Sequence, residues 1–499
     1  MEFLFTKTPL LFFVQNLWRD EAFTVLLSQQ NIGEIFRTTA IDFNPPLYYV
    51  FMHYWMLIFG SSEIAVRTVS LLFFILTLFI LFEMMVLILK IPFKRSLLYF
   101  SLILLNPLLL TYAFEARMYM MAAFFVTLSY FAQLTGRSKL YIVAITLALY
   151  THYFTILILI AQIIGMTNGS TIKKVLKRVR HGNLTAIINH LPSTAFLPIL
   201  LFLPWLLFLY TFHDFHTSDF WILPSSMQDL WYLPFVLFTG YQRVFGLYYH
   251  GQAGYTAFHL DMNILIWGIL FLPLAVFTAS IIRSTSTHKM PRVLQNRSRK
   301  YLLQYGIPLI LWTVVPPLAL FVISYFFTPV YHPRYFMFSI GGMMLLIILS
   351  IELVFFQKQK ALFPYKSIRI MHIHIYPLTI QKSIGVCICI LLLLVSSKYN
   401  EKNLKYNAKR TVSPLFREID RSMHAGDRVY LTRDLDYFLA KYYMTTDAIY
   451  IVGTPYEEIK TYVGKVLIPP TATSISQIPT YPARTFFVYY DRYVVRSEL

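Results

Sequence analysis

The chain has 499 residues, of which 57% are hydrophobic and only 13% are charged, whereas a soluble domain carries about 25% charged residues. Apolar blocks of about 20 residues can cross a membrane as helices, so this composition excludes a soluble globular protein. The net charge of +19 does not indicate a nucleic-acid partner, because the lysines and arginines lie in short connections between apolar blocks, as in the cytoplasmic loops of membrane proteins.

The first apolar stretch, residues 1–17, should supply the first membrane crossing, although Lys7 and Pro9 interrupt it. Either the true start of this helix lies upstream, or the helix is short and tilted. Residues 18–63 then form an outer loop. Within this loop we expect the aromatic-rich stretch 45–60 to lie along the outer membrane surface rather than to cross.

Ten further apolar blocks are candidate spans, which makes about eleven spans in all. They cover residues 64–89, 96–113, 118–134, 140–150, 154–166, 192–212, 261–282, 305–327, 336–356 and 376–396. The fourth and fifth blocks are too short to cross alone. We expect them to form a bent pair that meets at residues 151–153.

The charges of the connections predict the orientation, because cytoplasmic loops collect lysine and arginine. Five connections together hold 20 of these residues, namely 90–95, 135–139, 167–190, 283–304 and 357–375. The long connection 213–260 holds only Arg243, so we assign it to the outer face. The sequence therefore predicts a multi-pass protein of the cell (plasma) membrane with a cytoplasmic N-terminus and an extracytoplasmic C-terminus.

The composition changes after residue 396, where charged residues become frequent. Short β-type runs alternate there with helical stretches, a pattern typical of an α/β fold. The predicted strands are 428–431, 448–452 and 485–490, and the predicted helices are 414–424 and 435–443. The sequence thus predicts an α-helical transmembrane domain over residues 1–396 and a small extracytoplasmic α/β domain over 397–499, with 485–490 as a central strand.

Polar residues that could carry chemistry collect on the predicted outer face, from separate parts of the chain. They are Asp20, Glu21, Asp42, Asn44, Arg67, Glu115, Arg117, Tyr119, His152, His332, Arg334 and Tyr335. Charged groups near lipid are costly, and they mark functional sites or pair with one another. The grouping is therefore more informative than any single residue.

This set of residue types suits sugar transfer from a lipid phosphate. Breaking the sugar–phosphate bond leaves negative charge on the phosphate at the membrane surface, where arginines can stabilise it. A carboxylate can take the proton of an attacking acceptor hydroxyl. One base and a single displacement would invert the anomeric centre.

Each candidate also has a simpler interpretation. Asp20 or Glu21 could only begin a helix, where acidic residues favour the N-terminal dipole. Arg117 and Arg334 could be interface anchors, and His152 could be a hydrogen-bonded core histidine.

A metal site is the weaker possibility. His213, Asp214, His216 and Asp219 have donor types that suit zinc or a harder ion. No third firm ligand is evident, so we expect no metal, and a divalent ion stays a possibility without support. No other cofactor is expected.

Four motifs resemble the protein O-mannosyltransferase-like family of GT-C membrane glycosyltransferases, which is related to the lipid A aminoarabinose transferase. The motifs are residues 18–23 (WRDEAF), 42–49 (DFNPPLYY), 63–67 (EIAVR) and 115–119 (EARMY). The resemblance extends more loosely to Arg334 and Tyr335. It implies a GT-C fold, an inverting transfer with little or no metal dependence, and a polyprenyl-phosphate sugar donor.

The resemblance also implies roles for single residues. Asp20, with Glu21 beside it, corresponds to the catalytic acid of the family's first outer loop. Asp42 begins the family's Asp-x-His-Pro-Pro motif, in which Asn44 here replaces the histidine. The late Arg-Tyr pair of the family corresponds to Arg334 and Tyr335, near the lipid phosphate. From their residue types and outward placement, the expected ligands of the donor phosphate are Arg67, Arg117, Arg334 and Tyr335, and the residues expected to bind substrate are Asn44, Glu115, Tyr119, His152 and His332.

The sequence therefore predicts a glycosyltransferase of the cell envelope, for which a protein, lipid or glycan could be the acceptor. Two alternatives stay open. A transporter or flippase of lipid-linked sugars tends to show symmetric halves and polar sites at mid-membrane, and neither pattern is visible here. A membrane scaffold that binds partners through residues 397–499 would leave the outer carboxylates and arginines without a role.

Overall fold

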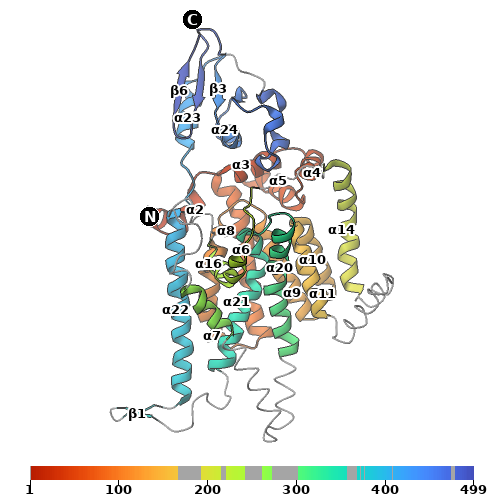
Figure 1. The fold of residues 1–499 in the computed structure, drawn as a ribbon, viewed down its shortest axis with the longest axis vertical. Helices are drawn as coiled ribbons and strands as arrows, with labels where there is room; N and C mark the ends of the chain where they lie inside the picture. Colours follow the sequence, from red (N-terminus) through yellow and green to blue (C-terminus); the bar gives the residue numbers. More distant parts are fainter. Residues whose placement is uncertain are drawn as a thin grey trace.

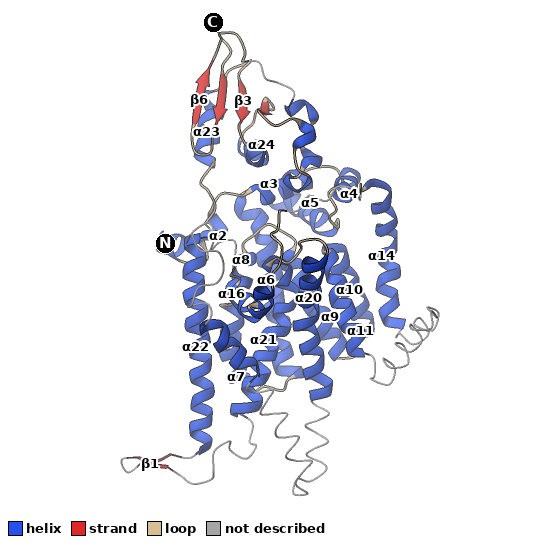
Figure 2. Cartoon of the chain, in the orientation of Figure 1, coloured by secondary structure: helices blue, strands red, loops and turns tan. Residues whose placement is uncertain are grey.

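The computed structural model describes residues 2–166, 193–214, 221–241, 261–271, 302–356, 368–370, 373–375, 377–406, 408–473 and 478–498. Long helices run side by side in a bundle, and a small unit with a β-sheet sits on one end of it (Figure 1). We call this the capped end. Figure 2 shows that helices dominate the bundle, with a short β1–β2 hairpin near its opposite end.

Four helices in the described part of the chain are long and apolar enough to cross a membrane. They are Glu63–Ile88, Gln304–Phe326, Pro333–Phe356 and Thr379–Lys405. They match the predicted spans 64–89, 305–327, 336–356 and 376–396. These helices confirm a multi-pass membrane protein, and the total of about eleven crossings stays a prediction.

The four spans comprise α6 (Glu63–Glu83) with η1 (Met84–Ile88), η3 (Leu302–Gly306) with α20 (Ile307–Phe326), η4 (Pro333–Phe336) with α21 (Met337–Ile351) and η5 (Glu352–Phe356), and α22 (Pro377–Tyr406). Three of these spans combine an α-helix with short π-helical turns (η1, η3 and η5) or a 3-10 turn (η4). α22 continues to Tyr406, beyond the domain boundary that the sequence suggested at residue 396.

Two predicted spans differ from expectation. Residues 1–17 form only the short helices α1 (Glu2–Lys7) and α2 (Leu11–Val14), so the predicted first crossing is wrong for these residues. The block 96–113 is not one straight helix, because α7 (Phe93–Leu104) and α8 (Pro107–Ala113) meet at an angle of 66°. Pro107 cannot donate a helix hydrogen bond, and Asn106 starts the new helix by accepting the amide of Leu109 at 3.0 Å.

The predicted pair 140–150 and 154–166 is present as two helices beside α9 (Tyr119–Leu134). α10 (Ser138–Thr151) starts at the far end of α9, where the Arg137 amide bonds the Ala132 carbonyl at 2.8 Å. The chain turns at His152, and α11 (Ile156–Met166) returns, since Gln162 bonds Ser129 at 2.8 Å. The turn therefore lies at the capped end, where His152 faces Tyr119 at 5.9 Å between ring centroids.

Helices that do not cross gather at the capped end. They are α3 (Arg19–Ser28), α4 (Ile32–Ile41) and α5 (Leu47–Phe59). α14 (Ser193–Phe212) forms one edge of the bundle (Figure 1). The next described helices in the sequence are α15 (Met227–Trp231), α16 (Leu233–Thr239) and the helix Asp261–Phe271. The α5 side chains Leu57, Ile58 and Phe59 are exposed, as expected of a helix along a membrane surface.

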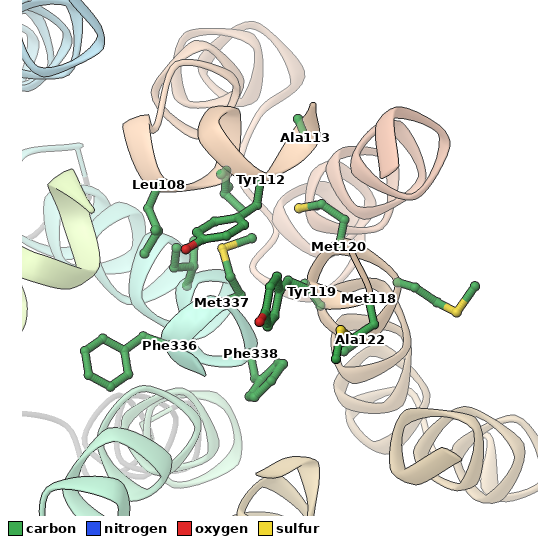
Figure 3. Packing of buried hydrophobic residues seen from close by; sticks show 14 of the residues in the cluster. Leu108, Tyr112, Ala113, Met118, Tyr119, Met120, Ala122, Phe336, Met337 and Phe338 are labelled. Atoms are coloured by element: carbon green, nitrogen blue, oxygen red, sulfur yellow. The ribbon is translucent and has the colours of Figure 1, made fainter. Parts of the chain in front are cut away.

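The bundle interior is packed by aromatic and sulfur-containing side chains. Figure 3 shows Tyr112, Tyr119 and Met337 gathered where α8, α9 and α21 meet. Deeper in the bundle, Trp312 stacks on Tyr130 with ring centroids 4.2 Å apart. This dense core fixes the helix ends that carry the polar residues described below.

The unit at the capped end has a four-stranded sheet in the order β4-β3-β5-β6. Its elements are β3 (Arg428–Leu431), β4 (Ile449–Ile451), β5 (Thr485–Val488), β6 (Tyr493–Arg496), α23 (Ser413–Ser422) and α24 (Tyr437–Tyr443). β3 pairs in parallel with β4 and β5, and β5 pairs antiparallel with β6. The three predicted strands and the interior place of β5 are confirmed, whereas β6 was not predicted.

Hydrogen bonds tie this unit to the start of the chain. Asn16 donates to the Ser413 hydroxyl at 2.9 Å and accepts the Val412 amide at 2.8 Å. The amide of Leu17 donates to the Tyr443 hydroxyl at 2.9 Å. The unit is therefore part of the framework around α3 rather than a loosely attached domain.

Candidate active site

A cavity of about 620 Å³ lies between the capped end of the bundle and the C-terminal unit. Its walls come from α3, the turn after α4, the start of α9, the turns at 152–154 and 328–335, and the segment 456–466. Eight of the twelve predicted site residues line it, namely Asp20, Asp42, Asn44, Arg117, Tyr119, His152, Arg334 and Tyr335. The volume is typical of a small-molecule site.

Asp20 projects into the cavity from the first turn of α3. Its carboxylate accepts a hydrogen bond from Arg19 Nε at 2.9 Å and lies 3.6 Å from Arg334 Nη1. Burial raises the pKa of Asp20, but the charges of Arg19, Arg117 and Arg334 outweigh it and lower the pKa to about 2. Asp20 is therefore a carboxylate at neutral pH.

Asp42 reaches the same cavity from the turn that follows α4. Asn44 donates its side-chain amide to Asp42 Oδ2 at 2.6 Å. Phe43 between them has φ of +55°, a left-handed conformation that is uncommon outside glycine and concentrates at functional sites. Burial raises the pKa of Asp42 to about 7, although the hydrogen bond from Asn44 acts in the opposite direction.

Arg117 has hydrogen-bonding capacity that the protein leaves unused. Its Nη1 donates to the Thr24 hydroxyl at 3.2 Å and to the Asp20 carbonyl at 3.4 Å. Its Nε is buried and has no hydrogen-bond partner among the described residues. A buried donor without a partner is costly, so this guanidinium is suited to a ligand with anionic oxygens.

Arg334 is held in place on several sides. Its Nε donates to His332 Nδ1 at 3.2 Å, its Nη1 donates to the Tyr119 hydroxyl at 3.3 Å, and its guanidinium stacks 4.8 Å from the centroid of Trp221. His332 does not line the cavity, so its contact with Arg334 orients the guanidinium. Tyr335 packs beside Arg334, with its ring 6.3 Å from that of Tyr119.

His152 lines the cavity as a neutral side chain. Its Nδ1 accepts the amide of Phe154 at 3.2 Å, and its ring lies 5.4 Å from that of Tyr335. Burial, together with the charges of Arg117 and Arg334, lowers the pKa of His152 to about 3. It can bind a substrate hydroxyl, but it does not add positive charge.

Glu21 and Arg67 lie outside the cavity lining and form a buried ion pair. Arg67 donates to the Glu21 carboxylate through Nε at 2.8 Å and Nη2 at 2.6 Å. The Ala116 amide donates to the same carboxylate at 2.9 Å, and Arg67 also donates to the carbonyl groups of Gln15 and Asn16. The pair therefore fixes α3 and the 115–117 turn relative to α6.

Glu115 also lies outside the cavity lining. Its carboxylate is 3.7 Å from the ammonium of Lys409, which in turn stands 4.5 Å from the centroid of Trp18. Burial raises the pKa of Glu115, while Lys409 lowers it. Glu115 thus joins the bundle to the C-terminal unit.

Several cavity residues were not predicted from the sequence. They are Arg19, Phe43, Trp221, Tyr456, Tyr462 and Lys465, while His213, considered above only as a metal ligand, also lines the cavity. Arg19 and Phe43 lie inside the motifs 18–23 and 42–49, so their position next to Asp20 and Asp42 could have identified them as cavity residues. The segment 456–466 carries no such signal, because its place depends on how the last part of the chain folds back on α3 and α4.

The sequence candidates for a metal do not come together in the described part of the chain. No group of three histidine, cysteine or acidic side chains is arranged there to hold an ion. The His213 ring instead lies tilted against Phe43, with the ring centroids 4.7 Å apart, and its Nδ1 contacts the Ile41 carbonyl at 3.0 Å. His216 and Asp219 lie outside the described residues.

Two crystal structures share this fold. ArnT from Cupriavidus metallidurans in the apo state matches with a TM-score of 0.53 and 11% sequence identity, over 96% of this chain and 91% of that chain. ArnT from the same organism bound to undecaprenyl phosphate matches with a TM-score of 0.51 and 12% identity, with the same coverage. No family model and no curated protein matches the chain. The expected GT-C fold is thereby confirmed, and the likeness to ArnT concerns the fold alone.

Proposed function

We propose that this chain is an inverting glycosyltransferase that moves a sugar from a polyprenyl-phosphate carrier to an acceptor hydroxyl at the outer face of the cell membrane. The observation that carries the proposal is a single cavity at one end of a membrane bundle that holds Asp20, Asp42, Arg117 and Arg334. The ArnT structure with bound undecaprenyl phosphate supports a lipid-phosphate donor.

The outward orientation follows from charge. α6, α9, α11 and η5 run away from the cavity, so their last described residues, which precede the lysine- and arginine-rich connections in the sequence, lie at the opposite end of the bundle. Connections of this kind are retained in the cytoplasm. The cavity and the C-terminal unit then face outward.

In the proposed reaction the acceptor hydroxyl oxygen forms a bond to the anomeric carbon of the sugar. The bond from that carbon to the phosphate oxygen breaks, and polyprenyl phosphate leaves with the electron pair. Arg117 and Arg334 balance the negative charge that develops on the leaving phosphate. The hydroxyl proton passes to the carboxylate of Asp20, and the single displacement inverts the anomeric centre.

The two carboxylates have different environments, which favours different roles. Asp20 is next to the arginines that would hold the phosphate, and its lowered pKa keeps it ionised at neutral pH. Asp42 titrates near neutrality and is positioned by Asn44. We assign to its ionised form the role of accepting a hydrogen bond from the acceptor and orienting it.

The remaining predicted residues bind the substrates or hold the walls of the cavity in place. Tyr119, His152 and Asn44 line the space for the sugar and the acceptor, and Tyr335 packs beside the phosphate site. His332 orients Arg334, and the ion pairs of Glu21 with Arg67 and of Glu115 with Lys409 hold the walls in place.

Donor turnover is the direct test. The protein in lipid is supplied with polyprenyl-phosphate sugars and a crude envelope extract, and free polyprenyl phosphate is followed by mass spectrometry. Release by wild type and at least a hundredfold less by Asp20→Asn would support the proposal. Movement of intact donor between leaflets without consumption would indicate a flippase instead and would overturn it.

A further inference from the structure

The outer wall of the cavity comes from the C-terminal unit. Three short turns form it, namely η7 (Tyr456–Glu458), η8 (Thr461–Val463) and η9 (Lys465–Leu467). Gly464 between the last two has φ of +96°, and a Cβ atom there would lie 2.7 Å from Phe23 and 2.9 Å from Phe438. The wall is thus seated directly on α3, the helix that carries Asp20.

Lys465 presents a positive charge on this wall. Its ammonium donates to the Glu457 carbonyl at 3.2 Å and stands 4.6 Å from the centroid of Tyr456. It forms no ion pair within the part of the chain that the structure describes. An ammonium has three donors, so the cavity side of Lys465 keeps capacity for an anion.

The other cavity cations are committed elsewhere. Arg19 pairs with Asp20 at 2.9 Å, and Arg334 lies 3.6 Å from the same carboxylate. Arg117 and Arg334 project from the bundle, where the donor phosphate is proposed to bind. A polyprenyl phosphate brings one phosphate group, so a further cation on the opposite, C-terminal wall is not needed for the donor.

Aromatic surface accompanies this charge. Tyr456 and Tyr462 both line the cavity, and Tyr462 is 41% exposed. Flat aromatic faces provide apolar contact area at low entropic cost. A cation beside two tyrosines is a suitable surface for a sugar ring that carries an acidic group.

We propose that the 456–466 wall is the acceptor subsite, in which Lys465 binds a phosphate or carboxylate group of an anionic saccharide acceptor. This inference rests on the proposed glycosyl transfer and identifies the class of its acceptor. The acceptor enters between the wall and the bundle, with its anionic group on Lys465 and its free hydroxyl directed to Asp20 and Asp42.

The first test compares Lys465→Gln and Lys465→Arg with wild type, and Lys460→Gln is the matched control on the same segment but outside the cavity lining. Transfer of radiolabelled sugar from a polyprenyl-phosphate donor is measured against the amount of envelope extract. We expect Lys465→Gln to raise the extract needed for half-maximal transfer about tenfold, as loss of a hydrogen bond to a charged group does. Lys465→Arg should retain most activity, and undecaprenyl phosphate binding should be unchanged in all three variants.

The labelled product identifies the acceptor. It should be retained on an anion-exchange resin, and its partition between organic and aqueous phases distinguishes a lipid-linked saccharide from a soluble one. A product that passes the resin, or a Lys465→Gln variant that behaves like Lys460→Gln, would overturn the subsite.

A second measurement does not depend on turnover. Amine-reactive labelling of Lys465 and Lys460 is quantified by mass spectrometry in the presence of glucose 6-phosphate or glucose. Selective protection of Lys465 by the phosphorylated sugar supports the subsite even if no transfer is detected, in which case only the proposed function has failed. Absent protection, or equal protection by glucose, would overturn the subsite while leaving the proposed transfer standing.

Discussion

Neutralising either of the two adjacent acidic residues on α3 should affect a different property of the protein, the transfer rate for Asp20 and the stability of the fold for Glu21. Asp20→Asn keeps the shape of a side chain that is 13% exposed and removes the charge that faces Arg19 and Arg334. The start of α3 does not depend on it, because Glu21 accepts the Trp18 amide. We expect the transfer rate to fall by about 10²- to 10⁴-fold, the range of a general base, with a smaller drop in the unfolding temperature in detergent than the Glu21 substitution causes, because the Asp20 carboxylate keeps some contact with solvent.

Glu21→Gln should destabilise the fold instead. Its carboxylate accepts from Arg67 at 2.8 and 2.6 Å and from the Ala116 amide at 2.9 Å, with no exposure to solvent. Removing one partner of a buried ion pair costs about 3–5 kcal/mol, a large part of a typical folding free energy of about 5–15 kcal/mol. Thermal unfolding followed by size-exclusion chromatography, alongside the donor-release assay, separates the two effects. An Asp20→Asn enzyme with wild-type turnover, or a Glu21→Gln protein as stable as wild type, would refute the reasoning.

Three further changes test the site and its walls. Arg334→Lys should weaken undecaprenyl phosphate binding about tenfold, because lysine lacks the planar fork and the stack on Trp221; titration calorimetry that gives equal affinities would contradict this. Burial raises the pKa of Asp42 to about 7, and its ionised form is the one proposed to act. The transfer rate should therefore rise as the pH increases through about 7, and Asp42→Asn should lower the rate and flatten its pH profile. A wild-type rate that is independent of pH over this range would argue against the role. Gly464→Ala should lower the unfolding temperature more than Gly453→Ala. Both glycines have a positive φ, but only at Gly464 would an added Cβ atom meet neighbouring aromatic rings. Equal drops in the unfolding temperature would show that this close packing is unimportant.

The main parts of the site could be predicted because membrane topology is readable from hydropathy and charge. Asp20, Asp42, Arg117 and Arg334 are far apart in sequence, yet each follows or precedes an apolar block on the same predicted side. The structure brings all four to one cavity. To group these residues, it was enough to predict correctly which side of the membrane each helix end faces. The wrong prediction of the first crossing did not affect that assignment.

The direction in which each side chain points could not be predicted in the same way. Successive residues on a helix are about 100° apart, so Asp20 faces the cavity while Glu21 faces Arg67 in the interior. Which of two neighbouring carboxylates is accessible depends on the packing of α3, and a single sequence does not contain that information. The same holds for Glu115, which turns toward Lys409.

The bend in the 96–113 block could have been predicted from a local sequence motif, which a hydropathy pattern does not take into account. Asn106 followed by Pro107 is the expected start of a new helix, and α8 begins there. The segment 456–466 had no comparable signal. Its contact with Phe23 depends on the complete fold of the C-terminal unit.

The hydrogen bonds that join residues 16 and 17 to Val412, Ser413 and Tyr443 have a consequence for biosynthesis. A nascent chain leaves the ribosome from its N-terminus, so the loop that carries Asp20 is inserted long before its final partners exist. We expect a membrane-embedded but immature intermediate that becomes competent only after the last hundred or so residues have been translocated. A premature stop codon before Tyr443 should therefore abolish function as completely as the loss of Asp20 itself.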